Sequence, residues 1–303
     1  MTRRPAIPIL PLAAALTLCL MVQACGVPDP GLTGTSAATV GGGSGYAALE
    51  ARFVGEGRLR GDRAPADAPW GAAELERNFA RIALSSEYRL GGSGMRADGA
   101  PGLLRRWTEP VRLEFRFGSS VPESQRARDR AAIADYAARL QGITGHPVGL
   151  AATDPNVLVL VMAADELRAL GPVLARDAPD MSAGARRAIM RMRPDILCLA
   201  VARPHADPRR GHRGAIVVVR AEHPPRLRRS CIEEELAQVM GLPDDSPAAR
   251  PSIFNDDEEF GVLTRHDEAL LRMLYDPRLR PGMTPAELAP LLPAVAADAA
   301  ALD

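Results

Sequence analysis

The sequence lacks lysine altogether, so all 37 of its basic residues are arginines, and 37 acidic residues balance them. Aromatic residues are also scarce, at 4% of the 303 residues. Because balanced charge gives no basic surface and few rings are present to stack on bases, we expect no nucleic-acid partner. The chain has neither a G-x-S-x-G turn nor a glycine-rich phosphate loop, which excludes the enzyme classes that depend on those motifs.

Hydrophobic residues make up 47% of the chain, enough to build the core of one large or two small domains. The N-terminus has two charged residues, Arg3 and Arg4, and then the apolar segment IPILPLAAALTLCLMV. This segment is too short and too interrupted by proline to span a membrane comfortably, and we interpret residues 1–24 as a signal peptide. The protein is therefore expected to be exported.

Ala24 and Cys25 follow this apolar segment directly and resemble the bacterial lipobox, whose cysteine is lipidated and becomes the mature N-terminus. The resemblance implies that a lipid on Cys25 anchors the chain to a membrane of the cell envelope, facing the periplasm. Ordinary cleavage after Ala24, with an incidental cysteine, is the alternative.

Two cysteines, Cys198 and Cys231, remain once Cys19 has left with the signal peptide and Cys25 has taken the lipid. In an oxidising compartment an even pair is most simply a disulfide. The alternative is a reactive thiolate on Cys231 at a helix start, which the three glutamates that follow would oppose. The sequence therefore favours the disulfide.

Periodicity divides the chain into a linker and a folded body. Residues 25–70 hold the lipidated N-terminus and stretches rich in glycine, serine and proline, which are expected to form a flexible linker. Near-continuous apolar runs over 157–163, 195–202 and 214–222, together with alternation over 111–117, predict strands. Helical patterns lie between these strands, and the last third of the chain is mostly helical. The prediction is an α+β, α/β-like domain over 71–283, a mixed sheet packed with helices, and a C-terminal helix over 284–303.

Four capping patterns predict where helices begin. They are Ser120–Glu123, Ser230–Glu233, Thr264–Asp267 and Thr284–Glu287. The second pattern is expected to start a short amphipathic helix that ends near Gly241. One arc of this helix is apolar, and its other side carries Glu234, Glu235 and Gln238; the apolar members are Ile232, Leu236, Val239 and Met240.

The spacing along this helix resembles the zinc-binding helix of metzincin proteases, whose pattern is H-E-x-x-H-x-x-G-x-x-H or D. Glu235 stands at the general-base position, Gly241 at the glycine and Asp244 at the third ligand. Glu234 and Gln238, however, occupy the two histidine positions. The resemblance therefore implies a metzincin-like arrangement that has lost its imidazole ligands.

These replacements decide the expected chemistry. Catalytic zinc prefers imidazole or thiolate, whereas a set of Glu, Gln and Asp offers only oxygen, which suits harder cations. We therefore expect no cofactor. The alternative is a divalent cation, Ca²⁺ or Mg²⁺ rather than Zn²⁺, held by Glu234, Gln238 and Asp244, with Glu235 as the acid/base of a divergent hydrolase or peptidase. Phe254 replaces the methionine that metzincins carry in their turn.

A wider resemblance covers roughly residues 72–283. The segments NFARIALSSEYRL, RWTEPVRLEFRFG and CIEEELAQVMGL, with the run that continues to residue 283, are similar to bacterial envelope proteins classed only as domain of unknown function 2927. The resemblance implies a zincin-like fold without zinc ligands and brings no activity with it. The chain is thus interpreted as a lipid-anchored envelope protein whose degenerate, non-catalytic zincin-like domain binds or assembles with an envelope protein or peptide. The divergent hydrolase stays the alternative.

The remaining polar clusters give weaker signals. His205, His212 and His223 flank strands in loops, and we expect solvated side chains there rather than a zinc site. The acidic run 255–259 is expected to be a solvated turn, with a calcium loop as the alternative. The arginines of PRRGHRG and PRLRRS would suit an anionic lipid or polysaccharide, but prolines interrupt them.

Overall fold

The computed structural model describes residues 42–85, 88–91, 94–97 and 102–302. The expected signal peptide, Cys25 and the first part of the expected linker lie outside these residues. Within the described ranges, no helix has both the length and the apolar character needed to cross a membrane.

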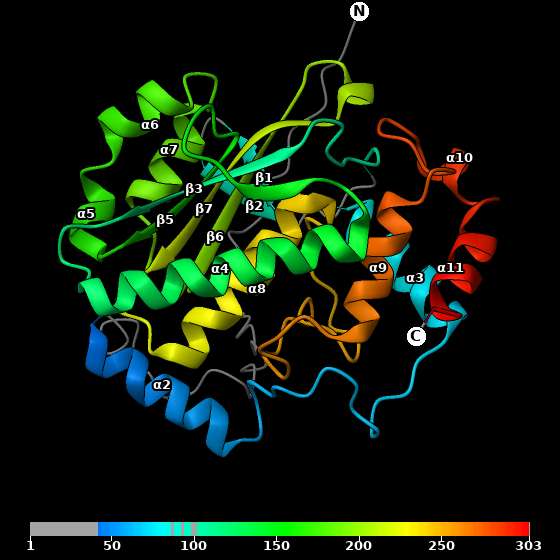
Figure 1. Ribbon diagram of the computed structural model, residues 1–303, viewed down its shortest axis with the longest axis horizontal. Coiled ribbons are helices and arrows are strands. Elements are labelled where there is room, and N and C mark those ends of the chain that lie inside the picture. The colour runs from blue at the N-terminus through cyan, green and yellow to red at the C-terminus, as the bar shows by residue number, and fades with distance from the viewer. Residues whose placement is uncertain (1–41, 86–87, 92–93, 98–101, 303) are drawn as a thin grey trace, which may run out of the picture. The chain divides into compact units, whose positions relative to one another are not determined.

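A mixed five-stranded sheet forms the centre of the fold, in the order β4-β3-β5-β7-β6 (Figure 1). Its strands are β3 (Val111–Phe117), β4 (Val148–Leu150), β5 (Val157–Met162), β6 (Cys198–Pro204) and β7 (His212–Arg220). The pairs β4–β3, β3–β5 and β5–β7 are parallel, whereas β6 pairs antiparallel with β7 at the edge. The predicted α/β mixed sheet is confirmed. The sequence gives no sign of β4 because three residues are too few to show a period.

The central strands are buried on both faces, as their continuous apolar runs predict. Along β5, Val157, Val159 and Val161 face one core, while Leu158 and Leu160 face another. This alternation follows from the two-residue period of a strand. The two cores together make the sheet the middle layer of the domain.

Helices cover both faces of the sheet (Figure 1). The smaller core, around Leu158, packs against α5 (Ala164–Arg168), α6 (Gly171–Asp177) and α7 (Ala183–Met190). The larger core packs against α4 (Glu123–Thr144) and α8 (Pro225–Gly241) and continues into a helical group. That group consists of α3 (Ala72–Ala83), α9 (Arg265–Tyr275), α10 (Pro285–Leu288) and α11 (Leu292–Ala300).

The C-terminal segment differs from its prediction in one respect. Thr284 caps α10 as expected, but the single helix predicted after it is two helices, α10 and α11. Pro290 lies between them, and a proline inside a helix removes a backbone donor and clashes with the preceding turn. Because α11 packs against α3 and α9, this segment shares the core of the preceding residues rather than standing apart.

The N-terminal part of the described chain holds a helix, α2 (Gly43–Gly55), where the sequence predicts a linker up to residue 70. The sequence does not predict this helix because it contains glycines, and glycine has low helix propensity. Packing overrides that propensity: Tyr46 and Phe53 form a small core with Leu59 and Leu227. A short hairpin, β1 (Tyr88–Gly91) and β2 (Gly94–Ala97), is a second element that the sequence does not predict.

Two of the four predicted caps are wrong. α4 begins after Pro122, and Glu166 binds the Ser120 N–H at 2.9 Å, so no serine cap forms there. α8 begins at Pro225, six residues before the predicted first residue Cys231, because proline suits the first helical position and the carboxylate of Glu50 accepts the Leu227 N–H at 2.8 Å. Thr264 does cap α9 as predicted.

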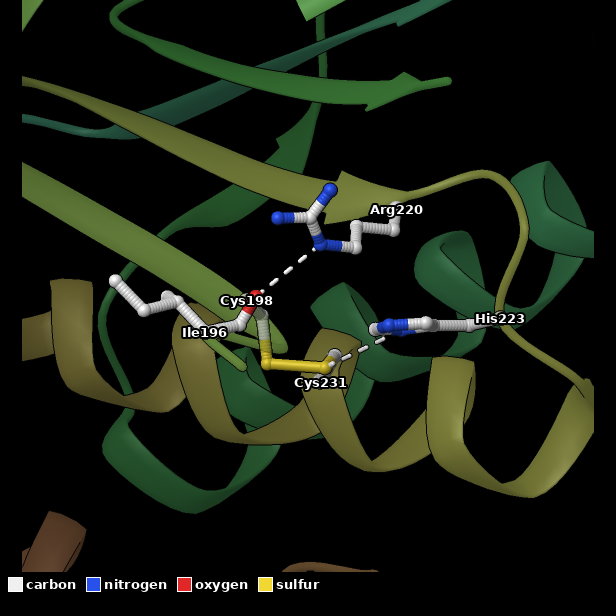
Figure 2. Close-up of a disulfide and its surroundings, with 5 residues drawn as sticks. All are labelled: Ile196, Cys198, Arg220, His223 and Cys231. Atoms are coloured by element: carbon white, nitrogen blue, oxygen red, sulfur yellow. Dashed lines mark hydrogen bonds between the residues drawn. A yellow bond between two sulfur atoms is a disulfide. The ribbon is translucent and has the colours of Figure 1, made fainter. Parts of the chain in front are cut away.

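The disulfide between Cys198 and Cys231 is confirmed and joins edge strand β6 to α8 (Figure 2). His223 approaches it, with Nδ1 3.8 Å from the Cys231 sulfur. Arg220 lies beside the bond and donates from Nε to the Ile196 carbonyl at 3.1 Å. The bridge therefore fixes the middle of α8 to the sheet, close to a buried imidazole.

Candidate functional site

The predicted apolar arc of α8 is confirmed, because Ile232, Leu236, Val239 and Met240 are all buried. Glu235 is buried too, with 6% of its surface exposed, whereas Glu234 and Gln238 are partly exposed. Burial of Glu235 places it inside the fold rather than on an open helix face.

Asp244, three residues past the end of α8, is 2% exposed and forms an ion pair with Arg81 of α3. Burial raises the pKa of this carboxyl above its usual value, and the Arg81 cation opposes the rise. Gln238 donates from Nε2 to Oδ1 of Asp245 at 3.3 Å. Two of the proposed ligands thus contact protein groups that stabilise them as structural residues.

The donor set fits a metal ion poorly. The guanidinium group of Arg81 already pairs with the carboxylate of Asp244, and Gln238 offers only a neutral amide as a ligand. In the ranges that the structure describes, no group of three or more His, Cys, Asp or Glu side chains could hold a metal ion. These residues therefore do not form a metal site that could take part in a reaction.

Residues 252–254, at the position of the metzincin methionine turn, are hydrogen-bonded to the start of α9. Phe254 is fully buried, and the Ile253 N–H donates to Oδ2 of Asp267 at 2.9 Å. Ser252 donates to the other oxygen of the same carboxylate. Asp267, itself fully buried, thereby joins this segment to the capping box of α9.

The acidic run after this segment is partly a salt-bridge network rather than a solvated turn. Glu259 pairs with Arg60 at 2.9 Å and with Arg250 at 2.7 Å. Both arginines also pair with Asp67. The run therefore joins residues 60–67 to residues 250–259, which the sequence separates widely.

Two of the three loop histidines are buried, which corrects the expectation that they are solvated. His212 is 3% exposed and His223 is 2% exposed. Burial, together with nearby arginines, lowers the pKa of each to about 3. His212 is the first residue of β7 and His223 follows the end of that strand. Their rings pack against Trp107 and Tyr46, so this packing decides their environment.

A groove of about 450 Å³ lies between α4 and α8 and holds none of the residues predicted for catalysis or metal binding. Residues of α4, residues of α8 and Arg63 line it. They are Arg63, Arg128, Asp129, Ala132, Asp135, Tyr136, Arg139, Pro225, Arg228, Arg229, Ile232 and Glu233. At 100° per residue, Glu235 lies about 200° around the helix from Glu233, so the groove and the predicted site use different faces of α8.

A buried ion pair closes one end of the groove. Arg228 donates from Nε to Oδ1 of Asp129 at 2.9 Å, and both side chains are less than 10% exposed. The same guanidinium donates to the carbonyl of His223. These contacts hold the second turn of α4 against the first turn of α8.

Glu233 anchors the other end. Its carboxylate pairs with Arg229 at 2.7 Å and with Arg139 at 3.3 Å, and it accepts the Leu263 N–H at 2.9 Å. Its backbone carbonyl accepts the hydroxyl of Tyr136 at 2.7 Å. Glu233 is thus a junction between α4, α8 and the segment before α9, rather than the capping residue that its position in the sequence predicts.

Cations outnumber anions in this groove, five arginines against three carboxylates. Desolvation lowers the pKa of Arg63, and the cations of Arg139 and Arg229 lower it further, although Glu233 opposes them. Among the described residues, none forms an ion pair with Arg63, Arg128 or Asp135. These three exposed side chains are the free charges of the groove.

Sequence reasoning did not assign this groove, although a signal for half of it exists. Arg128, Ala132, Asp135 and Arg139 follow one another at three- and four-residue steps, which places them on one face of a helix. The pairing of that face with α8 depends on how the two helices cross over the sheet, and no local pattern states it.

Comparison with known families gives one result. A family model described as a protein of unknown function, DUF2927, matches residues 72–294. The match runs from α3 into α11 and includes both helices of the groove. No curated protein and no solved structure matches the chain.

Proposed function

The chain belongs to the DUF2927 family, and we propose that it is a lipid-anchored protein of the bacterial cell envelope whose domain binds a partner instead of cleaving a substrate. In this proposal the signal peptide is 1–24, the lipid is on Cys25, and residues 71–283 with the C-terminal helix form a degenerate zincin-like domain. The membrane is one partner, through the lipid, and an envelope protein or peptide is the other.

The ion pair of Asp244 with Arg81 is the observation that favours a non-catalytic domain over a metal-dependent hydrolase. A metal ligand must present its lone pairs to the cation, but here a guanidinium group neutralises the carboxylate at the third ligand position. Glu234 and Gln238 stand at the other two positions, where the protease pattern requires imidazole. These observations favour a structural role for α8, the helix that resembles the zinc-binding helix of metzincins.

The disulfide supports the envelope location. A bond between Cys198 and Cys231 persists in an oxidising compartment, and cytosolic thiols are kept reduced. Together with the apolar start of the chain and the Ala24-Cys25 dipeptide, it favours an exported protein.

A complementation experiment tests the binding function against the hydrolase alternative. The full chain and its Glu235→Gln variant are expressed in a deletion strain and purified from its envelope. We expect the variant to complement as well as the wild type, and neither protein to carry stoichiometric metal or to cleave a peptide library. Metal-dependent cleavage that Glu235→Gln abolishes would overturn the proposal.

A second experiment tests the anchor. We expect Cys25→Ser to move the protein from the membrane fraction to the soluble fraction and to remove the lipid mass from its N-terminal peptide. A Cys25→Ser variant that stays in the membrane fraction would contradict lipid anchoring, while Cys19→Ser serves as the matched control.

A further inference from the structure

We propose that the groove between α4 and α8 binds an extended peptide segment with an acidic side chain near each end and a basic side chain between them. The inference rests on the proposed function, since it names the kind of partner that the domain would bind. It is drawn from three free charges, from the length of the groove along α4 and from the apolar wall beside them.

The two ends of the groove are cationic. Arg128 lies at one end, beside the pair of Arg228 with Asp129. Arg63 lines the groove as well, and Arg139 and Glu233, which mark the other end, are the charged groups that act on its pKa most strongly. Because guanidinium groups pair with carboxylates through two parallel hydrogen bonds, each end suits an aspartate, a glutamate or a chain carboxylate.

The length of the groove sets the spacing of those acidic groups. Arg128 and Arg139, which mark the two ends of the groove on α4, are eleven residues apart, and this corresponds to about 16 Å along the helix axis. An extended peptide advances by about 3.3 Å per residue, so its acidic side chains are expected four or five positions apart.

The middle of the groove carries the opposite charge. Asp135 is exposed there and forms no ion pair with a described residue. A uniformly anionic surface, such as a phospholipid membrane or an acidic polysaccharide, would be repelled at this point. A peptide with a lysine or arginine between its acidic residues would instead pair with all three free charges.

The walls are suited to hold such a segment. Ala132 of α4 and Pro225 of α8 are exposed in the groove, and the buried side chains of Tyr136 and Ile232 also line it, so the wall beside the charges is apolar. The buried pairs at both ends fix the two helices relative to each other. A groove held in one shape loses little conformational entropy when it is filled.

A peptide array tests the proposal. Seven-residue peptides with Asp, Lys or Ser at every position are probed with the full chain at low salt. We expect selection of peptides with two Asp residues four or five positions apart and a Lys between them. The double variant Arg63→Glu/Arg128→Glu is expected to lower this signal about tenfold, and Asp135→Lys is expected to move the middle preference from Lys to Asp.

The matched control is the double variant Arg168→Glu/Arg226→Glu, which makes the same charge change at two exposed arginines outside the groove. It is expected to bind as the wild type does. The proposal is overturned if no charge pattern is selected, if the groove variant keeps the wild-type pattern, or if all-acidic peptides bind best whatever stands at position 135. Any of these results with normal complementation would leave the proposed binding function standing, whereas cleavage dependent on Glu235 would end that function.

Discussion

Glu233 of α8 and Arg139 of α4 meet at one end of the groove, with Oε2 3.3 Å from Nη1. Arg139 also binds Glu268 of α9 at 2.6 Å, so one guanidinium joins three helices. A buried carboxylate is tolerated only when its charge and lone pairs are satisfied, and Glu233 meets that condition with two arginines and a backbone N–H.

Glu233→Gln is expected to lower the free energy of unfolding by about 3 kcal/mol, because it leaves the Arg139 cation half-compensated in a buried place. Urea denaturation of the full chain measures the loss. Glu123→Gln is the control, since Glu123 at the start of α4 pairs with Arg130 at the same 3.3 Å and with Arg126 at 4.0 Å, but its side chain is exposed to solvent. Equal stabilities of the two variants would contradict the anchoring role of Glu233.

The pair of Arg81 with Asp244 gives a prediction by double-mutant cycle. Arg81→Met leaves a buried carboxylate without its cation and is expected to cost about 2 kcal/mol, a figure reduced because Arg81 is half-exposed. Adding Asp244→Asn removes the stranded charge and is expected to restore about half of that loss. If Asp244→Asn alone were harmless to stability but released a bound metal, the structural interpretation of Asp244 would be wrong.

Loss of the disulfide is expected to destabilise the protein substantially. The bond closes a loop with a sequence separation of 33 residues. In the chain-entropy treatment such a loop contributes about 4 kcal/mol. Denaturation of Cys198→Ser/Cys231→Ser measures this term, and thiol titration of the unfolded, unreduced wild type provides the control. Free thiols from both residues in that titration would refute the bond.

Acid is expected to unfold the protein through His212 and His223, whose pKa values are lowered to about 3. Between pH 6.5 and 3 the unfolded chain binds protons at these side chains and the folded chain does not, so stability falls as the pH is lowered through this window. Above pH 6.5 the contribution is complete. We expect His212→Asn to reduce the slope of unfolding free energy against pH between 6 and 4; an unchanged slope would show that His212 does not control acid sensitivity.

The strands were predictable because their evidence is local. Val157, Val159 and Val161 alternate with leucines in a run that no surface helix would tolerate, which indicates a strand buried on both faces. Thr264 was predictable as a cap for the same reason, since its partner Asp267 is three residues away.

Other features depend on partners that are distant in sequence. Ser230 and Glu233 have the spacing of a capping box, but α8 begins before them. At its first turn the Leu227 N–H donates to the carboxylate of Glu50, which lies 177 residues earlier in α2. Likewise, the guanidinium of Arg81 reaches Asp244 across 163 residues. In each case a tertiary contact, and not the local spacing, decided the outcome.

The cations at both ends of the groove are guanidinium groups, and the chain has no lysine to take their place. An arginine side chain does not lose its proton in a protein. Acetylation and other modifications of the lysine amine, which would cancel the charge of a lysine, do not act on arginine at these positions. The groove therefore keeps the positive charge of its two ends, and a change in the charge match between groove and occupant must come from the occupant or from Asp135.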